Sequence, residues 1–156
     1  MKQVTEIIEI VFERVQLEKI AITLFELLSN SNLIDSYITT DVSKIDFQSK
    51  EKLHNSLVQS SEGAFSFYFL SFKLVEIQLH RVLLQIHKCN NVYDVNIIIE
   101  EKELIERVSI LELHKYVAIL AEELEATNFY CGFEPAMDKE TRLFTGKNLG
   151  PLKLRM

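Results

Sequence analysis

The stretch that decides the fold runs from residue 75 to residue 100 and reads VEIQLHRVLLQIHKCNNVYDVNIIIE. At positions 93–99 every second residue is apolar, a period typical of an antiparallel strand with one buried face. The first half alternates in the same way and is expected to place Leu79 and Leu83 on one face. Asn90-Asn91 lies between the halves, and asparagine tolerates the positive φ of a tight turn. We therefore predict a β-hairpin.

Two more segments favour strands. Residues 64–72 are rich in aromatic side chains. Residues 4–15 fit both an alternating strand and a helical face, and their many β-branched residues favour the strand. Residues 33–47 are expected to form an irregular connection that holds at most a short strand.

Helical periodicity is found in three segments, residues 17–28, 49–58 and 109–124. Ser109 and Glu112 have the spacing of a capping box, which marks the start of the third helix. The order of elements predicts one α+β domain over residues 1–156, with an antiparallel sheet of about four strands and helices packed on one face. Residues 128–156 are expected to form an irregular tail packed on this domain. The other face of the sheet is left to solvent or to a partner.

Composition excludes several classes of protein. With 156 residues, of which 47% are hydrophobic, the chain can bury a core without metals or disulfides. No signal peptide or membrane-spanning run is recognised, and Cys89 and Cys131 make no disulfide framework, so we expect a cytoplasmic protein without a membrane partner. The net charge is −6, and residues 94–140 hold twelve Asp or Glu against four Lys or Arg. This acidity argues against nucleic-acid binding and is compatible with docking to a basic protein.

Known catalytic and cofactor motifs are missing. The four histidines form no metal-ligand pattern, and His80 and His87 are expected on opposite faces of one strand. Glu100 and its acidic neighbours fit a charged strand end better than a metal site. Cys131 has no activating base nearby in sequence and is expected to be a partly buried structural residue. We predict no catalytic, cofactor-binding or metal-binding residues and no cofactor, and we expect no enzyme.

The segment after the third helix combines large aromatic residues with alternating charge, which is typical of partner-binding hot spots. Together with the acidic helix end, it gives the following predicted partner-binding residues: Glu122, Glu123, Glu125, Tyr130, Phe133, Glu134, Asp138 and Arg142. The structural alternative, given somewhat more weight, is that the tail wraps the sheet and completes the core, with Arg142 paired to Asp138 or Glu134. Both interpretations can hold together.

The run from Gly132 to Gly146, GFEPAMDKETRLFTG, follows a capped helix and an isoleucine-rich hairpin. In general appearance this last third to half of the chain resembles small immunity proteins of bacterial polymorphic toxin systems. The resemblance implies a non-enzymatic inhibitor that binds a cognate toxin by charge complementarity, and the acidity of the chain makes a basic toxin the expected partner. The main alternative is a regulatory domain that binds a small molecule between sheet and helices. An enzyme assembled from His80, Glu100 or Cys131 is the least favoured hypothesis.

Overall fold

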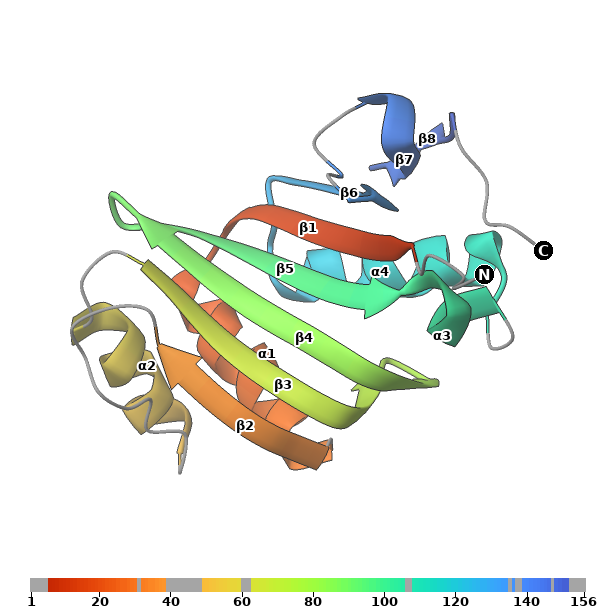
Figure 1. Cartoon of the computed structure of the whole chain (residues 1–156). Coiled ribbons are helices and arrows are strands. Elements are labelled where there is room, and N and C mark those ends of the chain that lie inside the picture. Colours follow the sequence, from red (N-terminus) through yellow and green to blue (C-terminus); the bar gives the residue numbers. More distant parts are fainter. Residues whose placement is uncertain are drawn as a thin grey trace.

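The predicted hairpin lies within a single antiparallel sheet in the computed structural model of the chain (Figure 1). The structure describes residues 6–30, 32–38, 49–59, 63–105, 108–134, 136, 139–146 and 148–151, with the backbone alone for residues 30, 32–38, 105 and 139. The elements are, in chain order, β1 (Ile7–Val15), α1 (Leu17–Asn30), β2 (Asn32–Ile38), α2 (Lys50–Gln59), β3 (Gly63–Leu74), β4 (Ile77–Cys89), β5 (Val92–Glu100), α3 (Glu101–Ile105), α4 (Ile110–Glu123), β6 (Asn128–Phe133), η1 (Lys139–Thr141), β7 (Arg142–Thr145) and β8 (Asn148–Leu149).

The sheet has eight strands in the order β2-β3-β4-β5-β1-β6-β7-β8, and all neighbouring pairs are antiparallel. β1 joins two meanders, because it pairs with β5 on one side and with β6 on the other. The strand prediction for residues 4–15 is confirmed by β1. The predicted number of about four strands is wrong, because the segment expected to be an irregular connection contributes the seven-residue strand β2, and the segment expected to be an irregular tail contributes β6, β7 and β8. These strands have six, four and two residues, too few for a clear alternation.

The β4–β5 hairpin is confirmed. Asn90 and Asn91 form its two-residue turn with φ angles of 52° and 61°. Two consecutive positive φ angles are those of a type I′ turn, whose twist matches that of the flanking strands. Along β5 the residues Tyr93, Val95, Ile97 and Ile99 are buried, as the alternation predicts.

A pair of opposed irregularities in β3 and β4 changes which side chains face the core. Leu70 and Arg81 lie opposite each other, between the pair Phe69–Val82 on one side and the pair Ser71–His80 on the other. Arg81 has a φ of 57°. Both side chains are exposed, and the alternation resumes one residue out of phase in each strand. The expectation that Leu79 and Leu83 share a face is therefore wrong: Leu79 is buried in the core, and Leu83 points to the opposite face.

The described helices that share the core lie on one side of the sheet, as predicted. In Figure 1, α1 and α4 run behind the central strands. Their apolar stripes join one core cluster with the fully buried residues Ile8, Ile10 and Phe12 of β1. The start of α4 is capped as expected, because the Glu112 amide donates to the Ser109 hydroxyl over 3.1 Å. None of the described helices is both long and apolar enough to cross a membrane.

A buried lysine fixes the end of α2. Lys88 lies at a core-facing position of β4 and is 6% exposed. Its ammonium group donates to the carbonyls of Leu57 and Val58, over 3.0 and 3.1 Å, and lies 5.7 Å from the centre of the Tyr93 ring. A cation at the last carbonyls of a helix satisfies acceptors that the helix leaves free.

Candidate functional site

One face of the sheet is not covered by any of the described helices (Figure 1). Its side chains alternate with those of the core along each central strand; Tyr68, for example, lies between Phe67 and Phe69, which are both fully buried. We call this surface the open face and define it by outward-pointing residues of four adjacent strands: Glu9, Glu13, Ser66, Tyr68, Leu83, Gln85, His87, Asp94, Asn96 and Ile98.

Three large side chains form a row across the middle of the open face. Tyr68 of β3 pairs with Leu83 of β4, and Leu83 pairs with Ile98 of β5. Cross-strand neighbours of this kind have Cβ atoms about 4.5–5.5 Å apart, so Leu83 lies within contact distance of both Tyr68 and Ile98. Each is half-buried, and none belongs to the core cluster or to the residues packed against it. We call Tyr68, Leu83 and Ile98 the central row.

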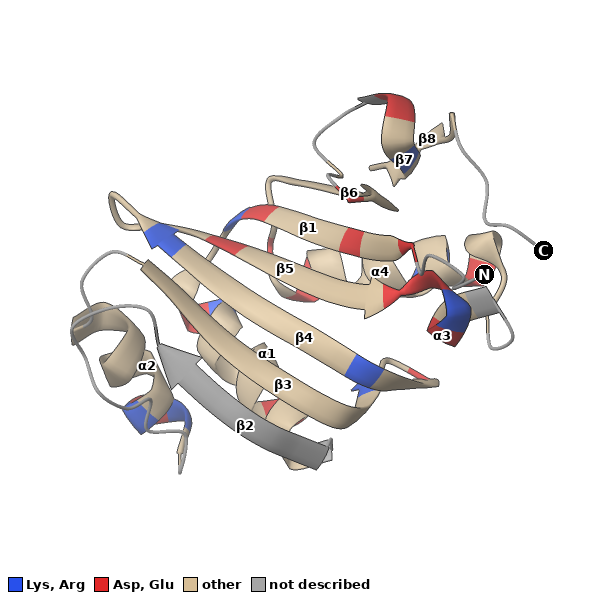
Figure 2. Ribbon diagram, viewed as in Figure 1, with Lys and Arg blue, Asp and Glu red and all other residues tan. Residues whose placement is uncertain are grey.

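An acidic stripe begins where the central row ends. Ile98 pairs with Glu9 of β1, and Glu13 lies on the same face of β1 four residues later. Asp94 of β5 lies near Glu13, because its carboxylate accepts the Arg14 amide over 2.8 Å. We call Glu9, Glu13 and Asp94 the acidic stripe. Figure 2 shows acidic residues recurring along β1 and at both ends of β5, whereas the middle of β3, β4 and β5 carries no charge.

Hydrogen bonds from the C-terminal meander hold the stripe in place. Glu13 accepts from the Asn128 side chain over 3.3 Å, and Glu9 accepts from the Ala136 amide over 3.4 Å. Neither bond neutralises a carboxylate. The stripe therefore presents fixed negative charge.

Tyr130 and Arg142, both predicted contact residues, lie together beside the stripe. The Arg142 guanidinium lies 4.3 Å from the centre of the Tyr130 ring, donates from Nε to the Ala136 carbonyl over 3.0 Å and donates to the Thr145 hydroxyl over 3.2 Å. Burial raises the pKa of the Tyr130 phenol, Glu13 raises it further, and Arg142 opposes both. Tyr130 is 5% exposed and therefore serves mainly as a platform for Arg142.

The prediction that the tail completes the core is confirmed for Leu143 and Phe144, which are fully buried in the main cluster. Tyr130, Val11 and Ala136 form a second, smaller cluster on the opposite side of the sheet. Of the two acids proposed to pair with Arg142, Asp138 lies outside the described residues. Glu134 is exposed, and its amide donates to the carbonyl of Ile7 over 2.9 Å.

The predicted partner-binding residues do not form one patch. Glu122, Glu123 and Glu125 are exposed at the end of α4, in the helical layer behind the sheet. Phe133 is half-buried and packs against the core. Sequence reasoning missed the acidic stripe, although the signal was available: Glu9 and Glu13 occupy polar positions of the alternating strand.

Within the helical layer, Glu123 alone of the three glutamates lines a groove, which has a volume of about 230 Å³. Glu26 and Lys73 also line the groove, and its apolar residues include Leu27 and Leu120. Burial raises the pKa of the Glu123 carboxyl, and the negative charge of Glu26 raises it further.

The residues suggested for an enzyme do not converge. Cys131 is fully buried in the core, and burial raises the pKa of its thiol far above its ordinary value. His80 and Glu100 point away from that core, on the side of the open face. His80 and His87 lie on one face, not on opposite faces, because the irregularity at Arg81 shifts the alternation; seven residues of strand, about 23 Å, still separate them. Within the described ranges, no three His, Cys, Asp or Glu side chains are placed to hold a metal ion.

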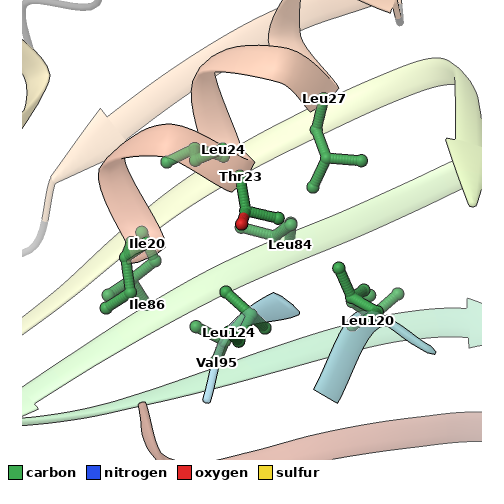
Figure 3. A pocket seen from close by; sticks show the side chains of 10 residues that line it. Ile20, Thr23, Leu24, Leu27, Leu84, Ile86, Val95, Leu120 and Leu124 are labelled. Atoms are coloured by element: carbon green, nitrogen blue, oxygen red, sulfur yellow. The ribbon is translucent and has the colours of Figure 1, made fainter. Parts of the chain in front are cut away.

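The space between α1, α4 and the central strands β4 and β5 is filled. Figure 3 shows the apolar side chains of α1, α4 and the strands between them pointing toward one another. The pocket that they line holds a free volume of about 10 Å³, close to the minimum for one water molecule. Small-molecule sites measure about 300–1,000 Å³. This pocket therefore does not favour the small-molecule alternative.

Comparisons with known proteins agree with the resemblance seen in the sequence. The model of a protein family described as "PABL017 Cdi1I immunity protein" matches residues 6–149. A chain of the 1.75 Å crystal structure of the toxic C-terminal tip of CdiA from Pseudomonas aeruginosa in complex with immune protein is similar over 96% of this chain and 99% of that chain, with a TM-score of 0.78 and 28% sequence identity. No curated protein matched the chain. The family match covers nearly all of the chain, which therefore belongs to the PABL017 Cdi1I immunity protein family.

Proposed function

We propose that this protein inhibits the toxic C-terminal tip of a CdiA-type protein by binding to it, and that it does so without catalysis. The family membership carries the proposal, and the similar crystal structure, which contains such a tip in complex with immune protein, supports it. The described side chains add support, because His80, Glu100 and Cys131 do not meet in one site.

We further propose that the bound surface of the toxin is basic. The acidic stripe lies on a sheet face that the described helices leave uncovered, and its carboxylates are held by neutral donors. Fixed negative charge attracts a positively charged surface and speeds encounter with it. The acidic end of α4, with Glu122 and Glu125, is the second candidate surface.

We also propose that the protein acts in the cytoplasm. The structure supports this with two free cysteines, of which Cys89 is exposed. An exposed free thiol suits a reducing compartment.

The function is tested by producing a cognate CdiA tip with and without this protein. We expect the tip alone to stop growth, co-production to restore growth, and the two proteins to purify as a complex. Purified complex should weaken as salt rises, because exposed charges are screened beyond about 8 Å at physiological ionic strength. A tip that stays toxic and elutes alone would contradict the proposal.

The two surfaces are separated by variants with the same change in net charge. Glu9→Lys with Glu13→Lys reverses the stripe, and Glu122→Lys with Glu125→Lys reverses the end of α4. We expect the first pair to lower the association rate at least tenfold and the second to change it less than threefold. The opposite ranking would move the interface to the helical layer.

A further inference from the structure

The central row is an unusual feature for a surface that meets only water. Tyr68, Leu83 and Ile98 come from three adjacent strands and are aligned by the strand register, so they form one continuous apolar strip. The core cluster lies on the other side of the sheet and does not include them. Packing among the residues that the structure describes therefore does not explain why all three positions are large and apolar.

The surroundings of the central row resemble the rim of a protein interface. A polar row runs beside it, in which Gln85 of β4 pairs with Ser66 of β3 and with Asn96 of β5. The Gln85 amide donates to the Ser66 hydroxyl over 3.1 Å, which restricts both side chains before any partner arrives. An apolar centre with a polar rim is the usual anatomy of a binding hot spot.

The charges around the row are not symmetric. The acidic stripe adjoins the row on the side of β1, through the pairing of Ile98 with Glu9. The opposite end of the central row is Tyr68, which pairs with Asp35 of β2, and the exposed Arg81 lies two residues before Leu83 along β4. A basic partner is therefore attracted toward the carboxylates of β1 and repelled from Arg81.

We infer that the central row is the anchor for the toxin, and that it receives an apolar side chain of the toxin whose Lys and Arg neighbours lie over the acidic stripe. This inference rests on the proposed function and adds the site, the orientation and the chemistry of the contact. The stripe governs how fast the complex forms, and the row governs how long it lasts. Charges at a rim act mostly on association, whereas a buried apolar anchor acts mostly on dissociation.

The test uses the full chain and a purified cognate CdiA tip, with binding followed in real time. Leu83→Thr with Ile98→Thr replaces two large apolar side chains of the row by a smaller, more polar one. Threonine is β-branched and is favoured in strands, so both strands should be kept. We expect dissociation at least tenfold faster, with the association rate and its salt dependence unchanged. The matched control is Leu111→Thr on α4, which removes an apolar side chain that is 64% exposed, and should leave both rates unchanged.

A second measurement does not depend on the stability of the row variants. In a Cys89→Ser background, a cysteine placed at Gln85 should react with a bulky maleimide in the free protein and be protected in the complex. Prior modification of Gln85→Cys should block binding, and modification of Leu111→Cys should not.

The outcomes separate the two proposals. If the unmodified protein does not bind the tip, the proposed function fails. If it binds, and both Leu83→Thr with Ile98→Thr and modified Gln85→Cys bind equally well, the inference alone is overturned. If modified Leu111→Cys loses binding instead, the toxin docks on the helical layer and the inference is again overturned.

Discussion

Replacing Gly132 by alanine should destabilise the protein by about 1–2 kcal/mol. Gly132 lies in β6, where it pairs with Glu9 on one side and with Arg142 on the other. A Cβ atom at this position would lie 2.6 Å from the Thr141 carbonyl oxygen and 2.9 Å from the Arg142 Cα. Ordinary contacts begin at 3.4 Å, so the oxygen would have to retreat by about 0.8 Å.

The estimate combines two opposing terms. Both obstructing atoms belong to the backbone of a paired segment, so neither can rotate away, and overpacking of this kind costs about 1–3 kcal/mol. Alanine also restricts the unfolded chain, which offsets about 0.4–1 kcal/mol. At about 2–4 °C per kcal/mol for a chain of this size, the unfolding midpoint should fall by about 2–8 °C.

Thermal and urea unfolding, followed by circular dichroism, measure this change. The matched control is Gly146→Asn in the same meander, where nothing lies within 4 Å of the added Cβ and the φ of 54° suits asparagine. We expect the control to stay within about 0.5 kcal/mol of the original protein. A Gly132→Ala protein as stable as the original would refute the steric argument.

Three further predictions concern pH, capping and thiol reactivity. Since burial and Glu26 raise the pKa of Glu123, the folded state binds that proton more tightly than the unfolded state, and stability falls as pH rises through the ordinary range of glutamate. Glu123→Gln should therefore raise the free energy of unfolding near neutral pH by at most about 1 kcal/mol and give no gain below about pH 4; an equal gain at both pH values would exclude this cause. Ser109→Ala should cost about 1 kcal/mol in urea unfolding, because the first turn of α4 loses its cap, whereas Ser109→Asp should retain most of the stability. In the native protein a maleimide should modify Cys89 and leave the buried Cys131 untouched until urea unfolds the chain; two equivalents taken up at once would contradict the burial.

The parts of the fold that follow local rules could be predicted from the sequence. The β4–β5 hairpin has a turn made of two asparagines, and α4 has a serine at its start and an apolar stripe along its length. Each signal lies within a few residues of the structure that it specifies. The resemblance to immunity proteins, taken from the last part of the chain, is confirmed by the family match over residues 6–149.

The parts that depend on distant contacts could not be predicted. β6 is a short strand that contains a glycine, and it is ordered by pairing with β1, 115 residues earlier at Asn128 and Glu13. Lys88 faces the core at an alternating position, which a polarity pattern assigns to solvent; only the carbonyls at the end of α2 explain its burial. The shift at Leu70 and Arg81 needs both strands at once, since one irregularity compensates the other.

The same limit applies to the candidate site. From the sequence, the partner-binding site was predicted in one continuous acidic and aromatic segment, because a sequence shows only which residues are neighbours along the chain. The acidic stripe instead combines Glu9 and Glu13 with Asp94, which are brought together by the pairing of β1 with β5. Its carboxylates also depend on donors from Asn128 and Ala136.

The place of β1 between β5 and β6 has a consequence for newly made protein. β1 can pair fully with β5 only after Glu100, the partner of Ile7, has been synthesised, and with β6 only after Phe133, the partner of Ile8, has been synthesised. At about 5–20 residues per second, a ribosome needs about 6–24 s to proceed from the end of β1 to the end of β6. During this interval the nascent chain carries Glu9 and Glu13 without β6, which helps to arrange them. We therefore expect a chain that ends before β6 to lack the ordered acidic stripe and to bind a toxin poorly.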